Sequence, residues 1–209
     1  MGISFVKAAA GAAVIAAAPA SAGVSIAQYL PCGSTEGLGS FNALVTYAHE
    51  GEGTAVVTVL LQNDTPMALG GYITALAVNG GAGVTGISFA SSSMASFGGL
   101  AGPVSAPPFG SFMSGASTGA SWLAGGAPGA GIGVGGSATF TFGITGSAES
   151  LGELTAETVF GTGPLQMAVR FRGGSPNDWS DKVLGCALPA PGAFALLGVM
   201  GMLAPARRR

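Results

Sequence analysis

The sequence predicts an all-β protein: an antiparallel β-sandwich with Greek-key-like connections, between an N-terminal signal helix and a short C-terminal apolar helix. Three observations predict this class. Apolar and polar residues alternate with a period of two in several segments, Gly, Pro, Ser and Asn separate these segments, and the middle of the chain has no amphipathic helical pattern. Two stacked sheets are favoured because a single sheet would leave half of its apolar side chains in water.

Composition and charge narrow the classes of protein that the chain can belong to. The 209 residues are 48% hydrophobic and only 8% charged, so they can bury a core and have room for one domain. Between the two ends of the chain, three Lys and Arg stand against nine Asp and Glu, a net charge of about −6. This balance argues against a nucleic-acid partner, because phosphate binding needs clustered basic residues.

The first predicted element is a signal peptide over residues 1–22. Lys7 is followed by an Ala-rich apolar run, and Ala20 and Ala22 form the small-residue pattern that signal peptidase recognises. We therefore expect cleavage after Ala22. The alternative, an Ala-rich structural helix, is less favoured because nothing caps it.

Residues 23–188 form the predicted β-sandwich domain. Its clearest strands are 137–145 and 165–172, in which apolar residues share one face. Segments 54–62 and 71–79 are apolar on both faces, as expected of central strands, and the turn residues between them predict an antiparallel pair. Weaker strands are predicted at 41–49, 84–89, 131–134 and 155–160.

Residues 90–129 are a long region rich in Gly, Ser, Ala and Pro. An irregular connection of this length is uncommon inside a compact domain. It contains Phe97, Phe109, Phe112 and Trp122. We expect a partly ordered flap whose aromatic side chains pack on the sheets.

The two cysteines, Cys32 and Cys186, lie near the two ends of the predicted domain. In an oxidising compartment they are expected to form one disulfide. Free thiols or an intermolecular disulfide are the alternatives. A zinc or redox site is disfavoured, because the chain has no C-x-x-C motif and a single histidine.

Candidate catalytic groups are few, and we expect no enzyme activity. His49, beside Glu50 and Glu52, is the only histidine, and the chain has no G-x-S-x-G motif. An exposed turn histidine is the favoured interpretation. A secreted hydrolase that uses His49 with a serine and an acid is the rival hypothesis.

Two sets of residues are candidate ligand sites, although ordinary structural roles are favoured for both. Oxygen ligands suited to calcium occur in two turns, where Asn and Asp are also common. Aromatic side chains could stack on sugar rings, but they form no cluster in the sequence. The calcium candidates are Asn63, Asp64, Asn177, Asp178 and Asp181, and the aromatic candidates are Tyr29, Tyr47, Tyr72, Trp122 and Trp179.

The last element, residues 189–209, has the composition of a sorting signal. Pro189, Ala190, Pro191 and Gly192 precede twelve mostly apolar residues, and the chain ends in Arg207, Arg208 and Arg209. Twelve helical residues rise only about 18 Å, less than the roughly 30 Å of a bilayer core. This predicts a transient inner-membrane anchor, with the arginines on the cytoplasmic side.

This arrangement resembles the PEP-CTERM tail, in a Pro-Ala-Pro variant with Ala190 where Glu is usual. The resemblance implies an exported bacterial protein whose tail is recognised by an exosortase-type membrane enzyme. A generic tail anchor is the alternative. The order of segments between residues 54 and 186 also resembles the bodies of a group of PEP-CTERM proteins, through 58–65, 70–79, 131–142 and 168–174.

The expected function is therefore that of a non-enzymatic exported protein of the cell surface or extracellular matrix. The alternative is a carbohydrate- or calcium-assisted adhesion module. The expected partners are signal peptidase, the exosortase-type enzyme, the membrane through the C-terminal helix, and an extracellular polysaccharide. No cofactor, metal or nucleic acid is expected.

Overall fold

The computed structural model describes residues 23–100 and 102–188. The predicted signal peptide with Ala20 and Ala22, and the predicted sorting tail with Pro189–Gly192 and Arg207–Arg209, lie outside the described residues. The elements are β1 (Val24–Ser34), β2 (Phe41–Gly51), β3 (Thr54–Asn63), β4 (Gly70–Val78), β5 (Val84–Ser92), β6 (Gly98–Leu100), β7 (Val104–Ser105), β8 (Ser111–Phe112), β9 (Ser114–Ser117), η1 (Pro128–Ala130), β10 (Ser137–Gly146), α1 (Ala148–Glu153), β11 (Met167–Gly174) and β12 (Trp179–Ala187).

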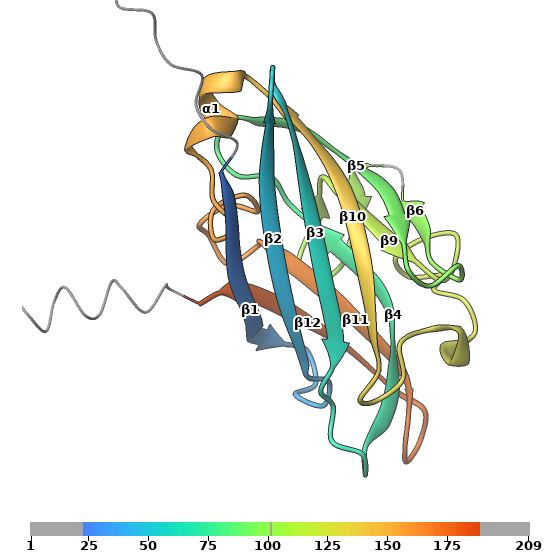
Figure 1. Ribbon diagram of the computed structural model, residues 1–209. Coiled ribbons are helices and arrows are strands. Elements are labelled where there is room, and N and C mark those ends of the chain that lie inside the picture. The colour runs from blue at the N-terminus through green and yellow to red at the C-terminus, as the bar shows by residue number, and fades with distance from the viewer. Residues whose placement is uncertain (1–22, 101, 189–209) are drawn as a thin grey trace, which may run out of the picture.

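Ten strands form one antiparallel sheet in the order β5-β10-β3-β2-β1-β12-β11-β4-β9-β6. The sheet folds over on itself, so that β1, β2, β3 and β10 lie in front of β12, β11 and β4 (Figure 1). Its two edges approach one another where Phe89 of β5 packs against Gly99 of β6. The all-β antiparallel class is thus confirmed. A division into two separate sheets is not, because the pairing of β1 with β12 makes the ten strands continuous.

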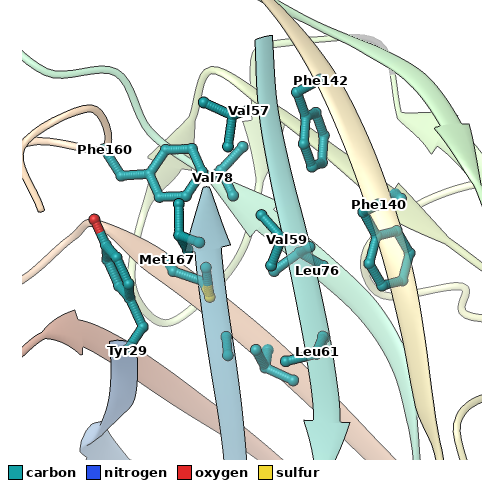
Figure 2. Close-up of a cluster of buried hydrophobic side chains, with 14 of the residues drawn as sticks. Tyr29, Val57, Val59, Leu61, Leu76, Val78, Phe140, Phe142, Phe160 and Met167 are labelled. Carbon is teal, nitrogen blue, oxygen red and sulfur yellow. The ribbon is translucent and has the colours of Figure 1, made fainter. Parts of the chain in front are cut away.

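The core fills the space between the two halves of the folded sheet. Alternation puts every second side chain of each strand on the inside, which gives β3 and β10 continuous apolar inner faces. Side chains from β3 and β10 meet side chains from β4 and β11 (Figure 2). The labelled members are Tyr29, Val57, Val59, Leu61, Leu76, Val78, Phe140, Phe142, Phe160 and Met167.

The structure contains six of the predicted strands and corrects three other predictions. The strands predicted at 41–49, 54–62, 71–79, 84–89, 137–145 and 165–172 correspond to β2, β3, β4, β5, β10 and β11. Neither 131–134 nor 155–160 is a strand: the first makes only an isolated bridge from Ile132 to Ile73, and the second is mostly turn. The predicted pairing of β3 with β4 is wrong, because β3 lies between β2 and β10 whereas β4 lies between β11 and β9.

Residues 90–129 are more regular than one long loop. They contain four short strands, of which β6 and β9 continue the main sheet and β7 and β8 pair with each other. Phe97, Phe112 and Trp122 are buried, and Phe97 meets Phe140 edge to face at 5.0 Å between ring centroids. Phe97 belongs to the main core. Phe112 and Trp122 instead form a second buried cluster with Ala75, Ala77 and Ala168, which lie on the opposite face of β4 and β11.

Candidate functional site

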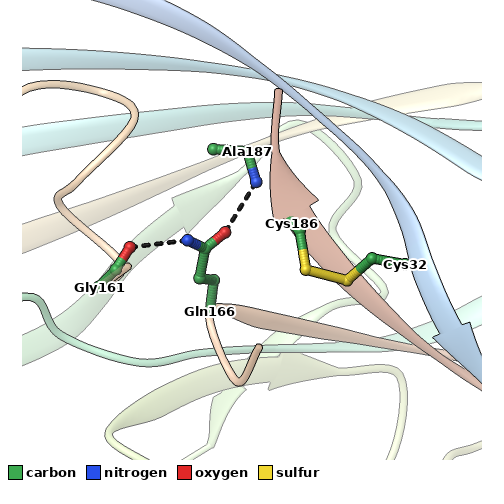
Figure 3. Close-up of a disulfide and its surroundings, with 5 residues drawn as sticks. All are labelled: Cys32, Gly161, Gln166, Cys186 and Ala187. Atoms are coloured by element: carbon green, nitrogen blue, oxygen red, sulfur yellow. Dashed lines mark hydrogen bonds between the residues drawn. A yellow bond between two sulfur atoms is a disulfide. The ribbon is translucent and has the colours of Figure 1, made fainter. Parts of the chain in front are cut away.

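The Cys32–Cys186 disulfide links the first strand of the body to the last (Figure 3). It spans 154 residues of sequence. Solvent can reach it, because Cys32 is exposed and Cys186 is half-buried. Beside it, the Gln166 amide donates from Nε2 to the Gly161 carbonyl at 2.8 Å, and its Oε1 accepts from the Ala187 N–H at 2.7 Å. The end of β12 is thus tied both to β1 and to the loop before β11.

Asp181, one of the calcium candidates, is a buried carboxylate that organises the β1–β2 loop. Burial acts to raise its pKa, but the hydrogen bonds that it accepts from Gly39, Ser34, Leu38 and Thr35 outweigh burial and hold the pKa below its ordinary value. Its oxygens accept from the hydroxyls of Ser34 and Thr35 and from the N–H groups of Glu36, Leu38, Gly39 and Lys182. Both oxygens are occupied, so Asp181 offers no free ligand to a cation.

The other calcium candidates serve turns. The Asn63 side chain is buried, and its Nδ2 donates to the carbonyls of Gly71 and Ile132 at 3.1 and 2.9 Å. Asn177 and Asp178 are exposed and adopt positive φ angles of 74° and 52° in the β11–β12 turn. Within residues 23–100 and 102–188, no three His, Cys, Asp or Glu side chains gather as metal ligands would.

His49 lines a hollow of about 200 Å³ together with Ser25, Tyr47 and Thr155. Its Nε2 is buried and has no hydrogen-bond partner among the described residues. The hydroxyl of Ser25, which lies on the wall of this hollow, accepts a hydrogen bond from the Ala156 N–H at 2.8 Å. The described residues therefore do not assemble a hydrogen-bonded Ser–His pair at this hollow.

Two arginines of β11 hold a loop through its backbone carbonyls. Arg170 donates through Nη1 to the Trp122 and Leu123 carbonyls, and Arg172 donates to the Gly125 and Gly126 carbonyls. Burial lowers the pKa of Arg170, and the positive charge of Arg172 lowers it further. The sequence feature that could have indicated this role is the pair of arginines spaced two residues apart on an otherwise uncharged strand.

The five aromatic candidates separate into buried and accessible groups. Tyr29, Tyr47 and Trp122 are buried, and burial, with Glu157 adding to it, raises the pKa of Tyr29. Tyr72 and Trp179 are half-buried. Tyr72 borders a hollow of about 380 Å³ whose other walls are mostly glycine backbone. The buried Tyr47 and Trp122 also line hollows, of about 200 and 250 Å³, whereas the Tyr72 ring is partly exposed beside its hollow.

Comparison with known proteins found no matching family model, no matching curated protein and no matching solved structure. Among the described residues, no helix has the length and apolar character needed to cross a membrane. The predicted C-terminal helix lies outside those residues.

Proposed function

We propose that this chain is a non-enzymatic exported protein of the cell surface or extracellular matrix, sorted by its PEP-CTERM-like tail through an exosortase-type enzyme. The observation that carries the proposal is the accessible disulfide between the first and last strands. Such a bond persists in an oxidising compartment and is rare in the cytosol. The segment with the sorting-signal composition, 189–209, follows directly after the strand that the disulfide holds.

The use of the polar groups supports the non-enzymatic part of the proposal. Asp181 and Arg170 are engaged in holding backbone, and the Nε2 of His49 has no hydrogen-bond partner within residues 23–100 and 102–188. Catalysis requires titratable groups that act on one another or on a substrate. We class the folded-over sheet as a flattened β-sandwich with Greek-key-like connections, supported by the crossing of the chain from β3 to β4 between its two layers.

Mass spectrometry of the protein recovered from its native host tests the sorting proposal. We expect a chain that begins at Gly23, lacks residues 193–209 and carries one disulfide. Replacing Arg207, Arg208 and Arg209 with alanine should leave the start at Gly23 unchanged and retain the tail. A surface form of the wild-type protein with an intact tail would contradict the proposal.

A second candidate function, glycan binding, is favoured by the hollow beside Tyr72. Aromatic rings next to open, polar-backbone hollows can stack on sugars, and this hollow is about 380 Å³ in volume. Tyr72→Ala should abolish retention on a polysaccharide from the host's matrix, whereas Tyr72→Phe, which keeps the ring, should preserve it. Equal retention of both variants would exclude this site.

A further inference from the structure

The outer face of the front half of the sheet carries no charged side chain except at its rim, where Glu50 is the last outward residue of β2. We define this outer face as the outward positions of β1, β2, β3, β10 and β5, which the strand registers place side by side. They are Val24, Ile26, Gln28, Asn42, Leu44, Thr46, Ala48, Thr54, Val56, Thr58, Leu60, Gln62, Gly86, Ser88, Ser91, Ser137, Thr139, Thr141, Gly143 and Thr145. Their counterparts on the inner face form the core.

Four aliphatic side chains stand out into solvent on this outer face. Val24 is 67% exposed, Ile26 62%, Leu44 43% and Leu60 42%. Leu44 and Leu60 are direct cross-strand neighbours and border a shallow groove of about 320 Å³. Contiguous exposed apolar side chains with a polar surround mark interaction surfaces more often than single exposed residues do.

The charges of the described body lie away from the centre of the outer face. Glu50 lies at the rim, on the outward side of the end of β2, and Glu52 lies in the β2–β3 turn. The remaining exposed carboxylates lie in other loops or on α1. The three cations, Arg170, Arg172 and Lys182, are on the opposite half of the sheet. Because the body carries a net charge of about −6, two copies repel one another except where uncharged surfaces meet.

We propose that the outer face is a self-association surface, on which a second copy of this chain docks face to face. The listed positions span five to nine residues of each of five strands, and with about 3.4 Å per residue and about 4.8 Å between strands they cover roughly 600 Å². This is the lower end of the roughly 600 to 1,000 Å² per partner of a specific interface. The same patch on both copies would give a two-fold symmetric dimer. A glycan fits less well, because no aromatic side chain lies on this face for a sugar ring to stack on.

Sedimentation velocity of the full chain, with its disulfide formed, tests this proposal. Leu60→Glu places a carboxylate at the centre of the interface in both copies, and we expect it to weaken dimerisation at least about ten-fold, since like charges brought together cost more than 1.4 kcal/mol. Met67→Glu is the matched control, because Met67 is 79% exposed and lies in the β3–β4 turn, off the outer face. It should dimerise like the wild type. Both variants keep the same chain ends, so association through the apolar ends affects them equally.

Salt provides a second measurement that does not depend on a variant. Screening of the carboxylates should strengthen wild-type dimerisation between about 0.02 and about 0.5 M NaCl. Equal association of wild type and Leu60→Glu, or a wild-type chain that stays monomeric, would overturn the proposal. If the wild type is a monomer whose migration is retarded by neutral dextran, and Leu60→Glu removes this retardation, the face binds a glycan instead of a second copy. An intact sorting tail in the host would contradict only the proposed function.

Discussion

At the scale of single residues, the structure depends on a few buried polar groups that bind backbone. Asp181 is the one buried carboxylate among the described residues, and it holds the loop from Ser34 to Gly39 in place. Arg170 does the same for the loop that contains Trp122. Both are far apart in sequence from the loops they hold, so each links an element to a distant segment.

Asp181→Asn should lower the free energy of unfolding by about 3 kcal/mol. The amide replaces one acceptor oxygen with an N–H₂ group that faces donors, and those donors are left without partners. Urea denaturation measures the loss. Asp178→Asn, at an exposed turn position, is the matched control and should stay within about 0.5 kcal/mol of the wild type. A similar effect for both changes would show that the Asp181 hydrogen bonds contribute nothing specific.

The lowered pKa of Asp181 predicts an acid-sensitive fold. A carboxyl whose pKa is lower in the folded than in the unfolded chain adds stability that is complete above the ordinary Asp pKa of about 3.9 and is lost as the pH falls through the lower folded pKa. The urea midpoint of the wild type should therefore fall between about pH 5 and about pH 2. Asp181→Asn should lose less across this range, and an equally steep fall would contradict the assignment.

At the scale of elements, strict alternation was readable from the sequence and irregular strands were not. The strand β10 alternates without a break and was predicted within one residue. The first strand was missed because Pro31 and Gly33 flank a bulge and because the exposed Val24 and Ile26 obscure its buried face. In β12, the inward positions are Asp181, Val183 and Gly185, which give no hydrophobic pattern.

The packing of Trp179 over Gly174 predicts how one element tolerates substitution. A Cβ on Gly174 would lie 1.8 Å from the Trp179 ring, so Gly174→Ala should cost about 3 kcal/mol through overpacking. Gly33→Ala is the control, because its Cβ would make an ordinary contact of 3.5 Å with Leu184. It should leave stability unchanged or raise it by about 0.5 kcal/mol. The melting temperatures of both variants test this prediction. A Gly174→Ala variant that melts at the wild-type temperature would contradict the described packing.

At the scale of the whole molecule, the sequence predicted the class of fold but not the order of strands. Local patterns reveal which side chains are buried, whereas partners such as β1 and β12 are separated by nearly the whole body. The turn after Asn63 looked like a hairpin, yet the buried Asn63 side chain binds Gly71 and Ile132 while the chain crosses to the other layer. The disulfide could be predicted from the expected oxidising compartment and from the presence of two cysteines. The loop contacts of Arg170 and Arg172 and the composition of the outer face could not be predicted, because they depend on the strand register.

The disulfide should contribute strongly to the stability of the whole body. A cross-link over 154 residues is worth about 5 kcal/mol in the chain-entropy model. Because Cys32 is exposed, dithiothreitol should reach the bond and lower the melting temperature of the native protein. The double variant Cys32→Ser with Cys186→Ser should melt at that lower temperature with or without reductant. A wild-type melt that reductant leaves unchanged after complete reduction would contradict this expectation.

The same bond determines how the body responds to mechanical load. Tension applied between residues 23 and 188 enters through β1 and β12, and the covalent link carries it from Cys32 directly to Cys186. The residues from 33 to 185 lie inside the closed loop and bear none of the applied tension. Only the short stretches 23–31 and 187–188 can be drawn out. A protein pulled by its ends therefore loses at most the pairing of the first part of β1 with β2, and it keeps strands β2 to β11 folded while the disulfide is intact.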